Sequence, residues 1–535
     1  MRPTIYSDRA EKNAMDRDSM WSSLGDSFDV LVIGGGATGL GIAVDAVTRG
    51  YRTALVEAGD FAQATSSRAT KLIHGGVRYL ASGQIHLVWE ALRERATLVK
   101  AAPHLVRPLG FVLPVYRRLE LPWYGAGLLT YDLLSGKSSL GPTKILGAKA
   151  TVERVPGIAR AGLAGSVLYH DAQFNDARLA LALARTAADY GAAVLNYVRC
   201  ERLVYEGGGG GNRLAGAVVR DVESGAEATV RARVAVNAAG IFSDEIRRMD
   251  HPGTGPLLSL SRGTHIVVSA DVLGNNHAIM VPKTRDGRVI FAIPWEGRVV
   301  IGTTDVAVAE TAVEPGHTEA EIEYLLEHIG PYLEKRIGRQ DVLSVFSGLR
   351  PLVTGKAAKT SQLSREHHIE ASQTGLITVA GGKWTTYRRM AQDTLDFAIR
   401  HSMLEPAACV TRELTIHGGR NGVGTLDPVL REYGSDVAAL RALMAEDASL
   451  AQRIEPGLPY SFAQVVYAVR AEMARTVEDV LSRRTRALLL DAQAALRAAP
   501  GVAAVMAREL GRGESWAAEQ VRGFGKLVRE NYCLC

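Results

Sequence analysis

Three glycines in the stretch GGGATG have the spacing of a dinucleotide-binding loop. Gly34, Gly36 and Gly39 follow the apolar run FDVLVI and precede the helical pattern GLGIAVDAVTRG. In such a strand, turn and helix, the backbone amides and the helix N-terminus can bind a pyrophosphate. Glu57 ends a second predicted strand, where a carboxylate accepts hydrogen bonds from ribose hydroxyls and repels a 2′-phosphate. The chemistry indicated is binding of FAD or NAD rather than NADP.

Two further turns of small residues favour FAD over NAD. NAAG ends at Gly240 and AGGKWTT begins at Ala380, each after an apolar strand pattern. A long dinucleotide with a tricyclic ring needs such additional approaches of the backbone. Gly381 and Gly382 can let the chain meet the ring, and a helix beginning near Thr385 would present its positive end to reduced flavin.

The stretch KLIHGGVRYL, residues 71–80, gathers reactive side chains without a hydrophobic period. Its glycine pair, which begins at Gly75, would let the backbone approach the N5 edge of flavin, with His74 beside it. Arg78 and Tyr79 would then face a substrate. On the residues alone, a surface ion pair for Arg78 and a core contact for Tyr79 stay open as the alternative.

Composition limits the classes of protein that can carry these motifs. The chain has 535 residues, 47% of them apolar, which predicts two to four globular domains. The net charge of +5 is too small over this length to indicate a nucleic-acid partner. The four cysteines, Cys200, Cys409, Cys533 and Cys535, form neither a disulfide framework nor a zinc spacing, so we expect no metal. No apolar run is long enough to span a bilayer.

The elements that position the motifs follow an α/β rhythm. After a polar tail at 1–27, we expect strand, helix and strand, then a helix in IHLVWEALRERATLVKAA and a helix followed by strands from residue 176. Between about 257 and 305 the pattern is that of an antiparallel sheet with turns at Asp286-Gly287 and Glu296-Gly297. After Glu405 the composition is helical, with a capping box at Ser461–Gln464 opening a helix predicted to run past Val477.

Several motifs together resemble the FAD-dependent glycerol-3-phosphate dehydrogenases. The resemblance covers roughly residues 28–400, and EMARTVEDVLSRRTR resembles that family's C-terminal domain. The motifs, in chain order, are GGGATGLGIAVDAVTRG, ATSSRATKLIHGGVRYL, RGTHIVV, IPWEGRVVIGTTD, SGLRPL and GGKWTTYR.

The resemblance implies an α/β fold with a glutathione-reductase-type, Rossmann-like FAD-binding domain, an inserted β-rich substrate domain and an α-helical C-terminal cap domain. We expect a flexible N-terminal tail at 1–27 and a discontinuous FAD-binding domain at 28–100, 170–250 and 345–400. The substrate domain is expected at 101–169 and 251–344, and the helical domain at 405–535.

The same resemblance implies oxidation of sn-glycerol 3-phosphate to dihydroxyacetone phosphate, by hydride transfer from C2 to flavin N5, in glycerol metabolism. Electrons would pass to a membrane quinone. The expected partners are therefore FAD, glycerol 3-phosphate, a quinone, a membrane surface and a second copy in a homodimer. The expected location is the cytoplasm, peripherally on the cytoplasmic face of the cell membrane.

The family's site residues carry over to matching positions of this chain. A phosphomonoester close to a dianion needs at least two cations, preferably guanidinium groups. Hydride removal from C2 also needs a base for the O2 proton, for which His265 is the candidate. Lys383 would stabilise developing negative charge. Asp305 would support the site, with Thr303 and Thr304 as its hydrogen-bonding neighbours.

Three sets of residues follow from this carry-over. The substrate-binding residues are Arg78, Tyr79, Arg350, Arg365 and Lys383. The catalytic residues are His265, Arg350 and Lys383. The cofactor-binding residues are Gly34, Gly36, Gly39, Glu57, Ser66, Ser67, Lys71, His74, Gly75, Gly240, Gly381, Gly382 and Thr385. The loop at 354–360 is shorter and more basic than the family pattern, and Arg365 follows it.

Other functions share parts of this pattern. A glycerol-3-phosphate oxidase that reduces O2 has the same motifs, and a flavin amine or hydroxy-acid oxidase has a related fold. A non-catalytic regulatory protein that binds flavin has no need for Arg78, His265, Arg350 and Lys383. The segment 115–137 mixes basic, aromatic and apolar residues, which fits either a membrane-interfacial segment or a buried core with two exposed arginines.

Overall fold

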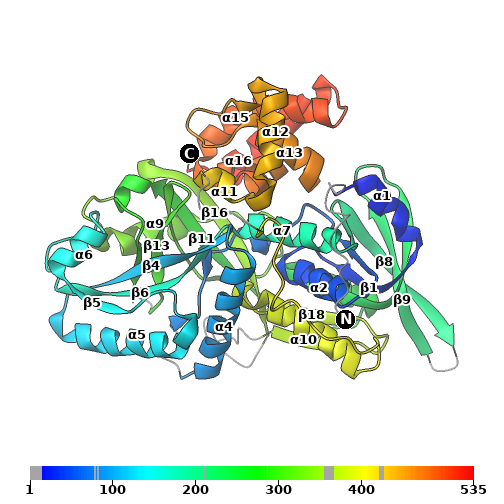
Figure 1. Cartoon of the computed structure of the whole chain (residues 1–535), viewed down its shortest axis with the longest axis horizontal. Helices are drawn as coiled ribbons and strands as arrows, with labels where there is room; N and C mark the ends of the chain where they lie inside the picture. The colour runs from blue at the N-terminus through cyan, green and yellow to red at the C-terminus, as the bar shows by residue number, and fades with distance from the viewer. Residues whose placement is uncertain are drawn as a thin grey trace.

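Two β-sheets lie side by side, and a group of C-terminal helices packs above their junction (Figure 1). This architecture is seen in a computed structural model that describes residues 15–77, 80, 83–208, 211–282, 284, 285, 287–354, 367–420 and 427–534. The α/β organisation with a helical C-terminal part is the one that the sequence predicted. Of the predicted site residues, Arg78, Tyr79 and Arg365 lie outside the described residues.

The first sheet has the order β17-β18-β10-β1-β2-β7, and β9 and β8 continue from β10. Its central strands run parallel, with β1 between β2 and β10. The strands are β1 (Ser27–Ile33), β2 (Thr53–Val56), β7 (Ala193–Leu195), β8 (Val198–Gly208), β9 (Gly211–Asp221), β10 (Glu227–Asn237), β17 (His367–Ala371) and β18 (Ile377–Gly381).

Both faces of this sheet are covered, which explains the continuous apolar run of β1. Val30 and Val32 pack in one core with helices α2 (Ala37–Thr48), α7 (Asp176–Asp189) and α10 (Tyr387–Arg400). Leu31 and Ile33 point to the other face, where the β8–β9 hairpin supplies part of a second core. Helix α2 begins just beyond the carboxyl end of β1, at the edge of the sheet where β1 and β2 both end.

The second sheet has the order β15-β11-β14-β13-β12-β4-β6-β3, with β16 beside β11 and β5 beside β6. At its centre Glu296 and Gly297 both have positive φ, 47° and 73°, and form the predicted tight turn between β13 and β14. The strands are β3 (Leu72–Ile73), β4 (Val106–Val115), β5 (Lys144–Gly147), β6 (Gly165–Phe174), β11 (Leu258–Ser269), β12 (Ala278–Val281), β13 (Ile290–Trp295), β14 (Arg298–Gly302), β15 (Val306–Val308) and β16 (Val342–Val353).

Helices pack on both faces of this sheet, one group against Ile266 and Val268 of β11 and another against Phe111 and Leu113 of β4. The predicted helix in IHLVWEALRERATLVKAA is α4 (Ile85–Ala101). The other helices of these two parts are α1 (Arg17–Ser22), α5 (Leu121–Ser135), α6 (Ala148–Arg154), α8 (Ser243–Asp250) and α9 (Glu319–Ile329).

The C-terminal helices form their own apolar core, which also takes in Val267, Trp295, Val300 and Phe346 of the second sheet. This part of the chain is therefore packed onto the second sheet rather than tethered by a linker. Its helices are α11 (Pro428–Arg431), α12 (Val437–Glu446), α13 (Phe462–Glu472), α14 (Ala487–Leu490), α15 (Ala492–Glu509) and α16 (Glu514–Asn531).

Three expectations about boundaries were wrong. Within the tail expected at 1–27, α1 is helical and Arg17 forms an ion pair with Asp221 at 2.6 Å. Strand β16 pairs with β11 in the second sheet, although residues from 345 onward were expected in the FAD-binding domain. The predicted capping box opens α13, but this helix ends at Met473 in the left-handed conformation, before Val477.

Candidate functional site

The glycine loop after β1 has the geometry that its sequence predicts. Gly34 has φ 116°, and an added Cβ would lie 2.5 Å from the carbonyl oxygen of Ala238. Gly36 is the N-cap of α2 and offers no side-chain acceptor of its own. The hydroxyl of Ser66 takes that place, accepting the Ala37 amide at 2.9 Å. Ser66 therefore lies at the helix N-terminus where a pyrophosphate is expected, and its contact with the cofactor stays a prediction.

Glu57 lies at the carboxyl end of β2, where the ribose partner of a dinucleotide is expected. Its carboxylate accepts hydrogen bonds from the amides of Gly35, at 2.6 Å, and Gly59, at 2.8 Å. Burial raises the pKa of Glu57, while the two amide donors oppose that shift. The two donors fix the direction of the carboxylate, and together with the glycine loop it fits a dinucleotide.

Three distant parts of the chain meet on residues 65–74. From the second sheet, the carbonyl of Leu349 accepts the Thr65 hydroxyl at 2.6 Å, and His265 Nε2 lies 3.0 Å from Thr70 Oγ1. From the GGKWTT turn, Trp384 Nε1 donates to the Ser66 carbonyl at 2.8 Å. These contacts bring the predicted cofactor loop and the predicted catalytic strand to one place.

The GGKWTT turn has the shape that its glycines allow. Gly381 and Gly382 have φ of 77° and 76°, in the left-handed region. Lys383 follows as the N-cap of a 3-10 turn at Trp384–Thr386, and α10 begins only at Tyr387. Thr385 is buried, with its hydroxyl 3.4 Å from the His74 carbonyl. The turn therefore packs against the segment that holds His74 and Gly75.

His265 lies on β11 with its ring stacked on Phe346 of β16, at 4.6 Å between centroids. Burial lowers the pKa of this imidazole well below its usual range, and the positive charges of Arg350 and Lys71 add to the effect. Its Nδ1 is buried and has no hydrogen-bond partner within the described part of the chain. The ring is therefore neutral near pH 7 and retains a basic nitrogen.

Arg350 lies on the same face of the sheet as His265, because Ser261, Gly263 and His265 of β11 pair with Arg350, Gly348 and Phe346 of β16. Its guanidinium donates to Thr303 Oγ1 at 2.9 Å and to the Thr304 carbonyl at 3.2 Å. Asp305 lies 3.8 Å away, in the supporting place expected for it. The Arg350 side chain is 22% exposed, so an anion can reach it.

Some predicted cofactor residues have structural contacts that the sequence did not indicate. Lys71 is fully buried, and its ammonium donates to Asp176 at 2.7 Å and to the Ser67 carbonyl at 2.9 Å. Burial lowers the pKa of Lys71 to about 7, while Asp176 opposes that shift. The missing side chain of Gly75 makes room for Tyr131, whose oxygen would lie 2.5 Å from an added Cβ. Beside Gly240, by contrast, an added Cβ would meet open space.

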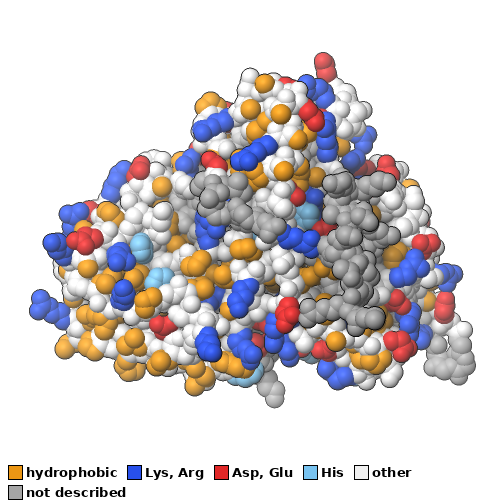
Figure 2. Space-filling view, viewed as in Figure 1, with side chains coloured by type: hydrophobic (Ala, Val, Ile, Leu, Met, Phe, Trp, Pro, Cys, Tyr) orange, Lys and Arg blue, Asp and Glu red, His pale blue; other side chains and the backbone are white. Residues whose placement is uncertain are grey.

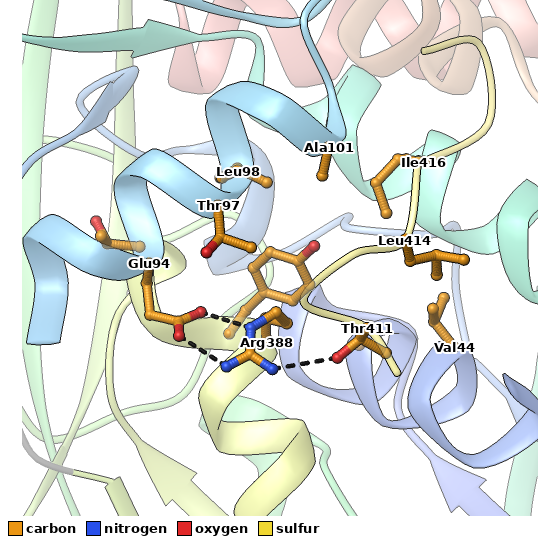
Figure 3. A pocket seen from close by; sticks show the side chains of 12 residues that line it. Val44, Glu94, Thr97, Leu98, Ala101, Arg388, Thr411, Leu414 and Ile416 are labelled. Carbon is orange, nitrogen blue, oxygen red and sulfur yellow. Dashed lines mark hydrogen bonds and ion pairs between the residues drawn. The ribbon is translucent and has the colours of Figure 1, made fainter. Parts of the chain in front are cut away.

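Arg388, the arginine of GGKWTTYR, lines a small pocket behind the turn and has a structural role. Arg388 and Glu94 form a buried bidentate pair, with both distances 2.7 Å, and Arg388 also donates to Thr411 at 3.2 Å (Figure 3). Thr385 lines the same pocket. The pair ties α10 to α4 and to the chain that leads to the C-terminal helices.

Glu321 is a site residue that the sequence reasoning missed. Its carboxylate accepts the hydroxyls of Thr264 and Thr304, both at 2.8 Å, and pairs with Arg262 at 2.8 Å. It thereby fixes the backbone whose carbonyl holds Arg350. The signal was present, since Thr318 and Glu321 form a capping box at the start of α9.

Two family models match this chain. One, described as FAD dependent oxidoreductase, matches residues 29–388. The other, described as the C-terminal domain of alpha-glycerophosphate oxidase, matches residues 372–520. The matches together span the glycine loop, the meeting point at 65–74 and the C-terminal helices.

Relatives and a solved structure agree with these matches. The chain is 41% identical to the mitochondrial glycerol-3-phosphate dehydrogenase of Rattus norvegicus over 95% of this chain and 74% of the relative. It is 42% identical to that of Homo sapiens over 90% of this chain and 70% of the relative.

The glycerol-3-phosphate dehydrogenase of Bacillus halodurans complexed with FAD superposes with a TM-score of 0.78. That comparison has 30% identity and covers 97% of this chain and 98% of the other. With a dinucleotide loop that fits FAD and relatives similar over most of its length, this chain belongs to the family of FAD-dependent glycerol-3-phosphate dehydrogenases.

Proposed function

We propose that this protein transfers the C2 hydride of sn-glycerol 3-phosphate to flavin N5, forming dihydroxyacetone phosphate, and passes the electrons to a membrane quinone. The observation that carries the proposal is the meeting of three distant segments on residues 65–74, with His265 and Arg350 on the second sheet. FAD, when bound, supplies the hydride acceptor. The protein must then supply an anion site, a base and a shield from water.

Arg350 provides the first cation of the anion site. Thr303 and the Thr304 carbonyl fix two sides of its guanidinium, so the fork has a defined direction before a phosphate arrives. Arg78, Tyr79 and Arg365 stay predictions for the rest of the phosphate and substrate contacts. A fixed guanidinium discriminates glycerol 3-phosphate from glycerol because only the former carries the phosphate.

His265 provides the base. A neutral imidazole accepts the O2 proton as hydride leaves C2, and the depressed pKa of His265 keeps the ring neutral before that step. Lys383, at the start of its 3-10 turn, would stabilise negative charge that develops on O2. The assignment of both roles stays part of the proposal.

An exposed apolar surface on α5 and on β5 beside it supports contact with a membrane, in which the quinone would be dissolved. Orange side chains gather over this region at the lower left (Figure 2). Leu119 is 93% exposed, Leu133 80% and Trp123 78%, so the buried-core interpretation of segment 115–137 does not hold for them. Basic residues flank the surface: Arg117, Arg118, Lys137 and Lys144.

This composition fits a membrane surface. Apolar and tryptophan side chains enter the interface while nearby lysines and arginines contact anionic head groups. No helix in the described ranges is long and apolar enough to cross a bilayer, so the contact we propose is peripheral. The homodimer and the cytoplasmic face of the membrane stay predictions.

An anaerobic titration tests the activity. The purified holoenzyme is mixed with glycerol 3-phosphate or with glycerol, and flavin absorbance is followed. We expect bleaching by glycerol 3-phosphate only. Bleaching by neither compound would leave a flavin-binding protein without this activity, and equal bleaching by both would remove the role of the phosphate site.

The electron acceptor needs a separate measurement. The reduced enzyme is offered a soluble quinone analogue or O2, and quinone reduction and peroxide are quantified. We expect quinone reduction to be much the faster. Stoichiometric peroxide at a comparable rate would instead indicate a glycerol-3-phosphate oxidase.

A further inference from the structure

Buried arginines of the C-terminal domain donate hydrogen bonds to residues 59–71, which we call the flavin-contact segment. Arg483 and Arg484 both donate to Asp60, and Arg484 Nη2 lies 2.9 Å from Asp60 Oδ1. All three side chains are 1% exposed or less. Asn196 donates to the same carboxylate at 3.1 Å. A carboxylate near the start of the segment is thus fixed by residues more than 400 positions away in the chain.

A second arginine contact lies next to Ser66. Arg486 Nη2 donates to the carbonyl of Ser67 at 2.6 Å and to Asp176 at 3.1 Å. Lys71 donates to the same Ser67 carbonyl at 2.9 Å. Lys71 and Arg486, which lie far apart in the sequence, therefore donate to the same backbone carbonyl, and both pair with Asp176.

The segment has a backbone that needs such support. Ala62 and Lys71 have φ of 60° and 63°, in the left-handed region that non-glycine residues seldom adopt. The Ala62 amide donates to the Gly35 carbonyl at 3.0 Å, and the Ala69 amide to Asp176 at 2.9 Å. Surrounding contacts keep the segment in a conformation that its own sequence does not favour.

The consequence of this conformation is the position of Ser66. Its hydroxyl accepts the Ala37 amide at the N-terminus of α2, and its carbonyl accepts Trp384 Nε1. Ser66 thus joins the glycine loop to the GGKWTT turn, and its neighbour Ser67 is the residue that Arg486 holds.

We propose that the C-terminal domain preorganises the FAD site, with Asp60, Arg483, Arg484 and Arg486 as positioning residues that hold the flavin-contact segment before FAD arrives. The inference rests on the proposed contact of Ser66 with FAD and not on the substrate or acceptor assignments. A preorganised segment pays no ordering entropy on binding, so FAD binds more tightly. The cap then has a function that does not require contact with the substrate.

The first test compares two arginine variants of the full chain. Arg486→Met loses the contact to Ser67, whereas Arg497→Met loses an exposed ion pair with Glu455 in the same domain, where Arg497 is 57% exposed. FAD is removed, and its dissociation constant is measured by flavin fluorescence. We expect Arg486→Met to weaken FAD binding about tenfold or more and Arg497→Met to change it less than about twofold. Equal FAD affinity in Arg486→Met and the unchanged protein would overturn the inference.

A second measurement needs no variant and keeps the test decisive if Arg486→Met does not fold. Hydrogen exchange is followed in the unchanged protein with and without FAD. We expect the amides of Ala62 and Ala69 to stay protected without FAD. If they exchange as fast as an unstructured peptide until FAD is added, then FAD orders the segment and the C-terminal domain does not.

A serine variant separates this inference from the site on which it rests. We expect Ser66→Ala to weaken FAD binding while hydrogen exchange of the segment stays slow. Unchanged FAD affinity in Ser66→Ala would refute the FAD contact of Ser66. Weak binding in Ser66→Ala together with full affinity in Arg486→Met would leave the site intact and refute the positioning role.

Discussion

Two regions of this molecule reverse the usual relation between polarity and burial. The flavin-contact segment is buried and densely charged, with Asp60 and Lys71 both at 0% exposure. The α5 surface is exposed and apolar, with Leu133 at 80% exposure. Most charged side chains lie on surfaces, and contiguous exposed apolar patches are uncommon, so each region departs from the ordinary pattern in its own direction.

The difference lies in where each region finds its partner. Every buried charge named in the flavin-contact segment is matched within the chain, so this region is complete in itself. Leu119, Trp123 and Leu133 face outward, whereas Leu128 and Tyr131 of α5 are buried against the second sheet. A buried charged cluster therefore indicates internal positioning, and an exposed apolar face indicates an external partner.

The largest expected effect follows from removing the shared carboxylate of the buried region. Asp176→Ala leaves the guanidinium of Arg486 buried without its counter-charge and removes the carboxylate that accepts from Lys71. We expect the free energy of unfolding to fall by about 3–5 kcal/mol, measured by denaturant unfolding of the apoprotein. Glu509→Ala is the control, since its partner Arg470 is 56% exposed and the loss should be below about 1 kcal/mol. Equal losses would show that the buried region has no special dependence on pairing.

The sequence predicted the local parts of this arrangement well. The glycine loop at Gly34 and the Glu296-Gly297 turn are each specified by residues next to one another in the chain, because positive φ selects glycine in most turns. His265 and Arg350 came from motifs and lie on one face of the second sheet. Their roles in catalysis stay predictions.

The parts that sequence reasoning missed depend on distant partners. The sequence analysis assigned no contact to the arginines of EMARTVEDVLSRRTR, yet Arg483, Arg484 and Arg486 are each only 1% exposed. Besides local acceptors such as Asp479, they donate to Asp60 and to the Ser67 carbonyl in another domain, and no local pattern marks these distant contacts. The end of α13 at Met473 was missed for the same reason, since no glycine or proline stops the helix there. The Met473 carbonyl instead accepts Asn196 at 2.9 Å.

The exposed apolar region gives a smaller expected effect. The double variant Trp123→Glu with Leu133→Glu should bind vesicles containing phosphatidylserine at least about tenfold more weakly, because each large apolar side chain contributes about 1.5–3 kcal/mol when buried. Cosedimentation with vesicles measures this. Val222→Glu with Val410→Glu is the control, since those side chains are 46% and 49% exposed but lie away from α5. Equal losses in the two variants, or none in the first, would contradict the membrane face.

His417 lies between the two extremes, since it is titratable, mostly buried and at the junction of the first sheet's helices with the C-terminal domain. Its two ring nitrogens lie 2.6 Å from Asp189 and 2.9 Å from Asp436. Burial lowers its pKa, but the hydrogen bonds to these carboxylates outweigh burial and raise the pKa above the ordinary value. Nearby His104 stays neutral in this range because burial lowers its pKa to about 3.

Because the pKa of His417 is raised in the folded state, the sign of its contribution to the pH dependence of stability is defined. The stabilising contribution of His417 is fully present below its unfolded pKa, near 6.5, and is lost as pH rises through its folded pKa. We expect the unfolding midpoint of the apoprotein to fall over this window, and His417→Asn to remove that part of the pH dependence. The effect should be smaller than that of Asp176→Ala, because His417 can lose its proton instead of remaining as an unpaired buried charge. If the unfolding midpoint depended on pH identically in the unchanged protein and in His417→Asn, then His417 would contribute as little to stability as an exposed charged group.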